Sequence, residues 1–155
     1  MSAPNPIDSA PAAPLPFLLG GAKEIAFAEL HRRLSEQGFE DIRAGHGCVF
    51  RFVGPEGMRL TELSEEAEMT KQACGEVVDH LEALGYVERV PDPGDRRAKV
   101  IRLTATGLEC QRAAARLFEE VEREWGERFG AARVELLRSL LAEIVAAERH
   151  PALAA

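Results

Sequence analysis

Two short β-type stretches lie on either side of a turn-forming segment in the middle of the chain. The first, YVERV, covers residues 86–90, the second, KVIRLT, covers residues 99–104, and PDPGDRRA joins them. Proline and glycine force the chain to turn between the two stretches, so the pattern predicts a β-hairpin with a charged tip. Every other element that the sequence predicts is a helix. The fold must therefore place one small hairpin among helices.

Helices are predicted on both sides of the hairpin from apolar periodicity and from residues that start and stop helices. Upstream they span about residues 17–37, 42–53, 61–67 and 70–84, and downstream a long helix and a last helix follow, ending near residue 148. The hydroxyls of Thr61 and Thr70 are predicted N-caps, because they can accept from a free backbone N–H. The long helix is predicted to start at Thr104 or at Thr106, and Thr106 with Glu109 has the form of a capping box.

Three helices carry an apolar stripe at helical spacing, which predicts their buried faces. The expected buried residues are Ala73, Val77, Leu81 and Leu84 in the fourth helix, Ala114, Phe118, Val121 and Trp125 in the long helix, and Val134, Leu137, Leu141 and Ile144 in the last. The opposite face of the fourth helix is expected to be mostly exposed, and it carries Lys71, Gln72, Gly75, Glu76, Asp79 and His80.

The order of these elements is that of a winged helix-turn-helix, in which two helices joined by a tight turn are followed at once by a hairpin. The second helix of the turn fits a DNA major groove about 12 Å wide, and the hairpin lies beside it as the wing. The chain has 155 residues, 46% of them apolar, which suits one domain with a real core. We predict a mainly α fold with a small β-hairpin wing, a disordered tail over 1–16, and a single regulator domain over 17–150 whose DNA-binding lobe covers about 42–104.

The charge of the chain restricts how it can contact DNA. The net charge is -7, so contact through bulk charge is excluded and a local patch must supply it. Arg96, Arg97 and Lys99 form such a patch at the hairpin tip, where they can meet phosphates or a narrow minor groove. Asp95 is placed to hold the Arg97 guanidinium through paired hydrogen bonds. A solvated hairpin tip is the alternative for these four residues taken alone; the preceding helix-turn-helix favours DNA.

The segment from about Arg59 to Gly107 resembles the MarR-type (multiple antibiotic resistance regulator) transcription factors. The matching stretches are RLTELS, MTKQ and VVDHLEALGYVERVPDPGDRRAKVIRLTATG, and Asp95-x-Arg97 followed by Leu103-Thr104 and Gly107 is the most specific part. The resemblance implies that Arg97 enters the minor groove and that Asp95 orients it. It also implies major-groove contacts from Thr70, Lys71, Gln72 and Gly75.

The resemblance has further implications for partners and ligands. Such proteins are homodimers through their first and last helices, here about 17–38 and 105–148, and they bind a double-stranded DNA operator as repressors. They commonly release DNA when a small aromatic or acidic ligand binds. By location, the candidate ligand contacts are His31, Arg43, His46, Phe118 and Trp125, each of which has a core, cap or surface role as its alternative.

One rival function stays open at this point. From Arg59 to Arg102 the chain has seven basic and ten acidic residues, so even the predicted DNA-binding lobe is not basic. A winged-helix protein-interaction module with weak or lost DNA binding is therefore the alternative to a regulator.

Other classes of site find little support. His46 and Cys48 are the only close pair of metal-binding residues, and two residues apart in a helix they point to different sides, so no metal is predicted. Cys74 lies near Lys71, which leaves oxidant sensing open. Three distant cysteines suit a reducing cytoplasm, residues 1–16 lack a signal-peptide pattern, and no apolar run is long enough for a membrane span. No catalytic motif is present, so neither an enzyme nor a cofactor is predicted.

Overall fold

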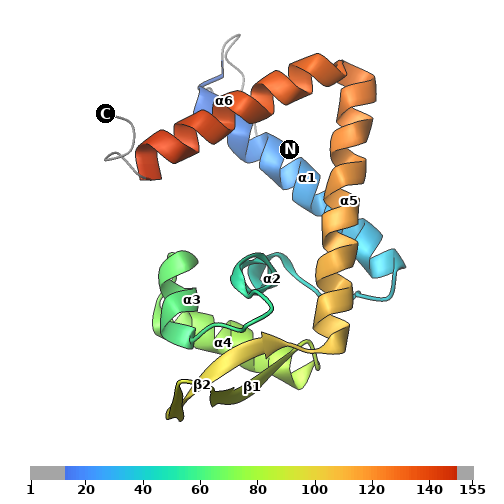
Figure 1. The fold of residues 1–155 in the computed structure, drawn as a ribbon. Helices are drawn as coiled ribbons and strands as arrows, with labels where there is room; N and C mark the ends of the chain where they lie inside the picture. The colour runs from blue at the N-terminus through green and yellow to red at the C-terminus, as the bar shows by residue number, and fades with distance from the viewer. Residues whose placement is uncertain (1–12, 150–155) are drawn as a thin grey trace, which may run out of the picture. The chain divides into compact units, whose positions relative to one another are not determined.

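The computed structural model describes residues 13–149, which form helices and one β-hairpin (Figure 1). In chain order the elements are α1 (Leu15–Glu36), the 3-10 helix η1 (Ala44–His46), α2 (Gly47–Phe52), α3 (Leu60–Glu66), α4 (Lys71–Ala83), β1 (Val87–Asp92), β2 (Asp95–Leu103), α5 (Ala105–Phe129) and α6 (Ala131–Arg149). The predicted mainly α fold with a hairpin directly after a helix-turn-helix is confirmed. The predicted tail lies mostly outside the described residues, and α1 begins inside it at Leu15.

The chain forms two compact units that meet within α5, between Ala115 and Arg116. The first unit contains every element from α1 to β2 and the beginning of α5. The second contains the rest of α5 and α6. The prediction of a single regulator domain over 17–150 stays a prediction.

The helix predicted over 42–53 is divided in two. A single turn of 3-10 helix, η1, comes first, and α2 follows it with only six residues. Val49 and Val53 are buried in this region, where α2 packs against α3 and η1. The other predicted helices of the first unit are found within three residues of their expected ends.

The buried face of α4 differs from the predicted one. Leu81 is buried as expected, but Cys74 and Val78 fill the core in place of Ala73 and Val77, which are half-buried. Both columns of α4 are apolar, and the packing of α4 against α3 and β1 selects the one containing Cys74. The predicted exposed face is confirmed for its polar side chains, and Gly75 is half-buried.

The same shift by one residue occurs in α5. Val121 is buried as predicted, whereas the other buried side chains are those of Cys110, Ala113 and Leu117. Among the described residues of α6 none is buried, and Leu137 and Ile144 of its predicted stripe are 45% and 50% exposed.

Threonine hydroxyls cap a helix at two of the predicted positions, Thr70 and Thr104. Thr70 Oγ1 accepts from Ala73 N–H at 3.1 Å, as predicted for an N-cap. The Thr61 prediction is wrong, because Thr61 is the second residue of α3 and the Glu62 carboxylate instead accepts from Arg59 N–H at 3.0 Å. At α5, Thr104 precedes the helix and its Oγ1 accepts from Gly107 N–H at 3.1 Å, so Thr104 caps it rather than Thr106.

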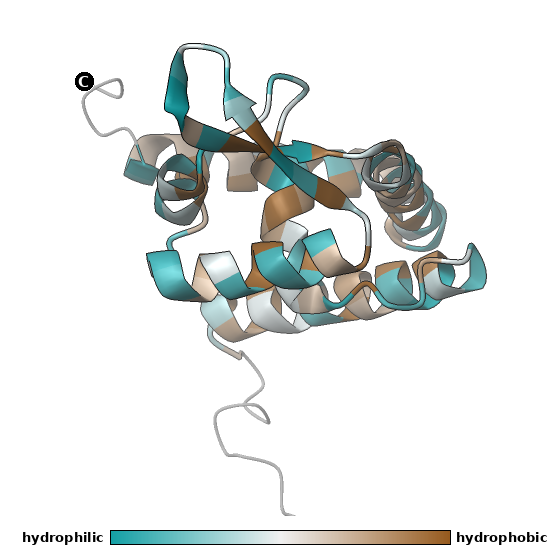
Figure 2. Cartoon of the chain, turned by 90° about the horizontal axis from the view of Figure 1, so that it is seen from below, coloured by the Kyte–Doolittle hydropathy of each residue, from teal (hydrophilic) through white to brown (hydrophobic). Residues whose placement is uncertain are grey.

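The hairpin is an antiparallel pair with an irregular tip. The register runs from Val87↔Leu103 to Pro91↔Lys99 and then shifts to Asp92↔Asp95, with Pro93 and Gly94 in the turn. β2 therefore has extra residues just after the turn, which form a bulge that includes Arg96 and Arg97. Figure 2 shows that the turn of the hairpin is hydrophilic, whereas hydrophobic residues lie along its strands.

Candidate nucleic-acid interface

The start of α4 brings together the residues predicted to face a major groove. Thr70 caps the helix, and Lys71 and Gln72 are exposed in its first turn. Gly75 follows one turn later and is half-buried. The Leu60 side chain lies next to it, and a Cβ at position 75 would be 3.7 Å from Leu60 Cδ2. Gln72 Nε2 donates to Glu76 Oε1 at 3.4 Å, so the two side chains are neighbours on the same exposed face. This arrangement leaves one face of the first two turns of α4 accessible to a partner.

The hairpin tip exposes the three predicted basic residues, Arg96, Arg97 and Lys99. Asp95 is also exposed, and its Oδ1 accepts a hydrogen bond from Arg97 N–H at 3.0 Å. This contact differs from the expected one, in which the carboxylate holds the guanidinium. Asp95 therefore orders the backbone at Arg97 and leaves the charged end of the side chain to solvent. An Asp side chain that accepts from the backbone two residues later is a common turn contact.

Ion pairs neutralise the other arginines between residues 59 and 102. Arg59 pairs with Asp92 at 2.5 Å, Arg102 pairs with Glu88 at 2.8 Å, and Arg89 pairs with Asp79 at 2.6 Å and also with Glu82. Within the part of the chain that the structure describes, Lys71, Arg96, Arg97 and Lys99 form no ion pair. Between residues 59 and 102 the uncompensated positive charge thus lies at the start of α4 and at the wing tip.

Asp92 is a site residue that the sequence reasoning missed. Its Oδ1 accepts from Gly94 N–H at 2.8 Å, and its Oδ2 contacts the Arg59 guanidinium. The turn hydrogen bond and the guanidinium together lower the pKa of Asp92. The Asp-Pro-Gly order at residues 92–94 was a signal for the turn contact, since Asp favours such positions. No local pattern indicated the partner 33 residues away.

The five candidate ligand residues are divided between the two units. In the first unit, the ring centroids of His31 and Phe27 lie 6.3 Å apart, Arg43 is exposed, and His46 is buried. In the second unit, Phe118 and Trp125 are half-buried in α5. The role of these residues in ligand binding stays a prediction.

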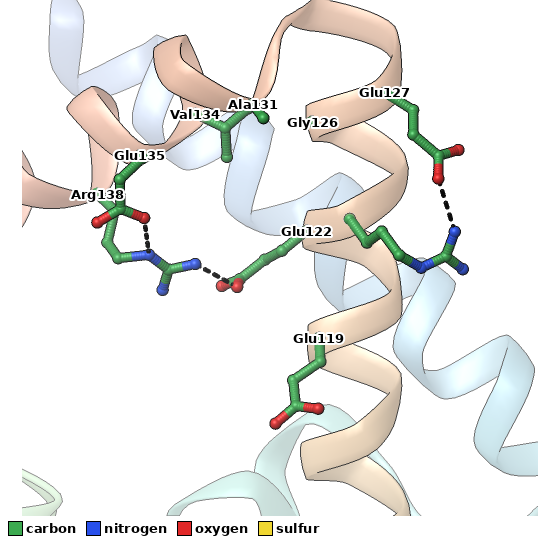
Figure 3. A pocket seen from close by; sticks show the side chains of 9 residues that line it. Glu119, Glu122, Gly126, Glu127, Ala131, Val134, Glu135 and Arg138 are labelled. Atoms are coloured by element: carbon green, nitrogen blue, oxygen red, sulfur yellow. Dashed lines mark hydrogen bonds and ion pairs between the residues drawn. The ribbon is translucent and has the colours of Figure 1, made fainter.

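An open pocket of about 480 Å³ lies between α5 and α6 of the second unit (Figure 3). Its charged side chains are largely paired: Arg138 contacts Glu122 and lies 3.2 Å from Glu135, and Arg123 lies 2.8 Å from Glu127. A smaller pocket of about 290 Å³ lies in the first unit, between residues 54–55 and the base of the wing. Neither of these two pockets is lined by a candidate ligand residue.

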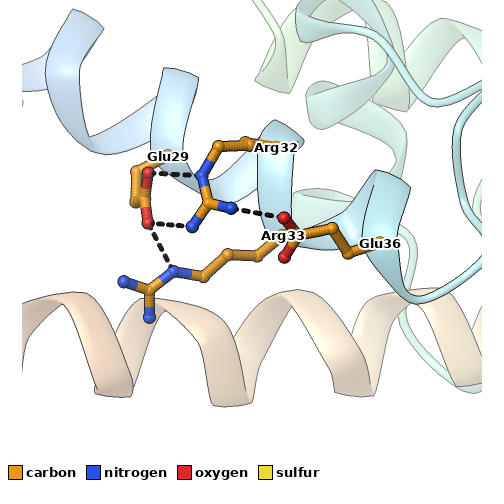
Figure 4. A network of polar contacts seen from close by, with 4 residues as sticks. All are labelled: Glu29, Arg32, Arg33 and Glu36. Carbon is orange, nitrogen blue, oxygen red and sulfur yellow. Dashed lines mark hydrogen bonds and ion pairs between the residues drawn. The ribbon is translucent and has the colours of Figure 1, made fainter.

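Helix α1 carries a chain of charged contacts on its surface (Figure 4). Glu29 binds Arg32 at 2.7 Å and Arg33 at 2.6 Å, and Arg32 also contacts Glu36. The two guanidinium groups lower the pKa of Glu29 to about 2. The spacings of three and four residues are those at which helix side chains meet, so the network supports α1 itself.

His46 forms a polar contact in the core of the first unit. Its Nδ1 accepts from Arg43 N–H at 3.1 Å, which leaves the proton on Nε2, and Nε2 lies 3.1 Å from His80 Nδ1. Burial is the main cause that lowers the pKa of His46, and the positive charge that His80 can acquire adds to it. The contact joins η1 to α4, so His46 has a packing role that its sequence position did not reveal.

This environment makes stability depend on pH. In the unfolded chain His46 takes up a proton near its ordinary pKa, whereas the folded chain disfavours the charged form. The contribution of neutral His46 to the free energy of unfolding should therefore be complete above about pH 6.5 and be lost as the pH decreases. This group changes the free energy of unfolding by at most about 1.4 kcal/mol per pH unit. Urea unfolding at several pH values would measure this slope. A His46→Gln variant should lose part of it, and an unchanged slope would contradict the assignment.

The described structure offers no metal site or activated thiol. No group of three or more metal-binding side chains is found among residues 13–149. Cys74 is fully buried, and burial raises its pKa, as it does for Cys48; the pKa of Cys110 is raised to about 12. A thiol that stays protonated is a poor nucleophile, so these features oppose oxidant sensing by Cys74.

Thiol reactivity would test this directly. In the native protein Cys74 and Cys110 are expected to resist a disulfide reagent such as Ellman's, because both are buried and protonated, while half-buried Cys48 reacts slowly. All three should react at once in denaturant. Rapid labelling of native Cys74, located by mass spectrometry, would contradict the expectation.

Comparisons with known proteins agree with this geometry. Residues 41–98 match the model of the MarR family. The regulator HosA of Escherichia coli O111:H- is 31% identical over 106 residues, which cover 68% of this chain and 78% of HosA. In addition, no helix among the described residues has the length and hydropathy needed to cross a membrane.

Two solved structures show the same fold. The reduced form of MarR from E. coli matches with a TM-score of 0.73 and 23% identity, covering 87% of this chain and 98% of that one. CouR from Rhodococcus jostii RHA1, bound to p-coumaroyl-CoA, matches with a TM-score of 0.67 and 22% identity, covering 91% of this chain and 95% of CouR. The family-model match and the relationship to HosA establish that this chain belongs to the MarR family of DNA-binding transcription regulators, which are not enzymes.

Proposed function

We propose that this regulator is a homodimeric repressor that binds a roughly palindromic operator. The observation that carries the proposal is that, between residues 59 and 102, the unpaired positive charge lies at Lys71 at the start of α4 and at Arg96, Arg97 and Lys99 in the wing. The other contacts of the interface would come from Thr70, Gln72 and Gly75, with Asp95 ordering the wing backbone. Such a surface can bind DNA although the chain as a whole is acidic, because phosphate contacts depend on local charge.

Exposed apolar side chains support the dimer. In α1 they are Leu15, Phe17, Leu18 and Ile25, and in α6 they are Leu136, Leu137, Leu140, Ile144 and Val145. Side chains of this size in such numbers are unusual on the surface of a monomer, so a second copy of the chain is the expected cover for each helix. Two-fold symmetry then places the two α4 helices in successive major grooves, about 34–36 Å apart.

A small aromatic or acidic molecule is proposed to release the operator. The solved structure of CouR contains p-coumaroyl-CoA, which shows that a protein of this fold can hold an aromatic acyl ligand. His31, Arg43, His46, Phe118 and Trp125 remain the candidate contacts on this chain. His46 is the least accessible of them, because it is only 4% exposed and its two ring nitrogens are already in contact with Arg43 and His80.

The test is fluorescence anisotropy of the purified protein with DNA from its own upstream region, against scrambled DNA, at several salt concentrations. Preferential binding that weakens as salt rises is expected, since phosphate contacts release counterions. Addition of candidate aromatic acids to the bound complex would then reveal release. Absence of preference even at low salt, on this DNA and on a selected random pool, would contradict operator binding.

A second candidate function is favoured by the surface of α3. Its carboxylates Glu62, Glu65 and Glu66 are exposed beside the proposed interface, and Glu68 is exposed just after the helix. Acidic side chains here oppose phosphate, so a protein-interaction module with weak DNA binding is the alternative. Binding of DNA that is weak and equal for all sequences would support it.

A further inference from the structure

We propose that Arg59 and Asp92 form a tether that positions the wing for DNA, so that both are positioning residues rather than DNA contacts. This inference rests on the proposed role of the wing in DNA binding. It concerns two residues that are 33 positions apart in the chain: Arg59 immediately precedes α3, and Asp92 ends β1.

The backbone beside Arg59 is fixed to the wing strand β2. Met58 N–H donates to Ile101 O at 3.0 Å, and Ile101 N–H donates to Met58 O at 2.8 Å. Gly57 lies so close to β2 that a Cβ on it would be 2.9 Å from Ile101 O, and its φ of +80° also favours glycine. Arg59 is therefore held at a defined point between the base of the wing and the helix-turn-helix.

The side chain of Arg59 continues this connection to the far end of the hairpin. Its Nε lies 2.6 Å and its Nη2 2.5 Å from Asp92 Oδ2. The other carboxylate oxygen accepts from Gly94 N–H at 2.8 Å, inside the turn. The Asp92 side chain is only 14% exposed, so the contact is shielded on the Asp92 side more than a typical surface ion pair. One carboxylate thus joins the start of α3 to the tip of the wing.

The location of the tether explains what it would do. Arg96 and Arg97 follow the turn directly and lie in the bulge, where the register of the ladder is broken. Beyond Pro91 the strand pairing is irregular, and the Asp92 carboxylate supplies contacts that the ladder lacks. A tip that is already ordered loses less conformational entropy when its arginines meet DNA. The tether also connects the wing tip to α4, because Arg59 directly precedes α3 and α3 packs against α4.

Charge and position predict opposite results for one substitution. Asp92→Asn removes a negative charge close to the DNA surface and frees Arg59, so electrostatics alone would tighten binding. A positioning role predicts the reverse, a weakening of operator affinity by about tenfold, because both wings of the dimer lose their order. Glu88→Gln is the matched control: it breaks the ion pair with Arg102 at the base of the same hairpin and should leave affinity unchanged or slightly tighter.

The experiment measures operator affinity by anisotropy for wild type, Asp92→Asn, Glu88→Gln, Arg59→Gln, Arg59→Lys and the Arg59→Gln, Asp92→Asn double variant. Arg59→Gln should weaken binding and Arg59→Lys should restore part of it. The double variant should bind about as well as Asp92→Asn alone, because the two residues act through one contact. Thermal melts would verify that each variant is folded. Amide hydrogen exchange at Gly94 and Arg97 in the free protein should be faster in each variant that lacks the contact between Arg59 and Asp92.

Two results would overturn the tether. One is an affinity of Asp92→Asn that equals or exceeds that of wild type; the other is unchanged exchange at the wing in both Asp92→Asn and Arg59→Gln. The exchange measurement needs no DNA, so it separates failure of the tether from failure of the proposed function. Should Asp92→Asn fail to fold, the comparison of Arg59→Gln with Arg59→Lys decides the question in the same assays.

Discussion

The substitution Gly107→Ala is expected to destabilise the protein by about 3 kcal/mol or more, because the added methyl group clashes with a backbone carbonyl oxygen. A Cβ at Gly107 would lie 2.0 Å from Tyr86 O and 3.3 Å from Leu103 Cβ. The carbonyl cannot move freely, since it accepts from Thr104 N–H at 3.0 Å. Tyr86 itself is buried, and its hydroxyl donates to Asp41 at 2.6 Å. The first turn of α5 must therefore shift away from the lobe.

Urea unfolding at a fixed protein concentration would measure this loss, with concentration held constant because a dimer unfolds in a concentration-dependent way. Gly126→Ala is the control in the same helix. Its new Cβ would meet Ala131 at 3.5 Å, an ordinary contact, and alanine favours helix by about 1 kcal/mol over glycine. Equal stability of Gly107→Ala and wild type would show that α5 does not approach Tyr86 this closely.

Loss of Arg97 is expected to weaken operator binding by about tenfold to a hundredfold, corresponding to roughly 1–3 kcal/mol, while stability and dimerisation stay unchanged. Its side chain is exposed and makes no ion pair in the described structure, so Arg97→Ala removes no internal contact of the guanidinium. The hydrogen bond to Asp95 uses the backbone N–H and survives the substitution. The effect should therefore lie in binding alone.

Arg102→Ala is the matched control for this variant, because Arg102 lies on the same strand and its charge is paired with Glu88. Anisotropy titrations would compare the two, and size-exclusion chromatography would verify the oligomeric state. Arg97→Ala should also reduce the dependence of affinity on salt if Arg97 contacts phosphate. An unchanged affinity for Arg97→Ala would refute the assignment of the wing to DNA.

The buried faces of α4 and α5 show how far apolar periodicity can predict which residues are buried. Periodicity correctly predicted that α4 and α5 each have one buried face, and Leu81 and Val121 lie on those faces. It did not separate Val77 from Val78 or Phe118 from Leu117, because neighbouring columns of each helix are both apolar. The choice depends on which elements pack against the helix. In α6, Leu137 and Ile144 of the predicted stripe are exposed, and the cover proposed for them is a second chain.

What the sequence determined by itself is local: the hairpin, its Pro-Gly turn, the Thr70 cap, and the family to which the segment from Arg59 to Gly107 points. Turn residues, caps and periodicity act over a few neighbouring positions, so a short stretch of sequence is enough to predict the structure that they favour. Which distant groups meet, such as Arg59 with Asp92 and His46 with His80, depends on the packed fold. These partners are 33 and 34 residues apart, and packing of the intervening helices and strands, rather than any spacing in the chain, brings them together.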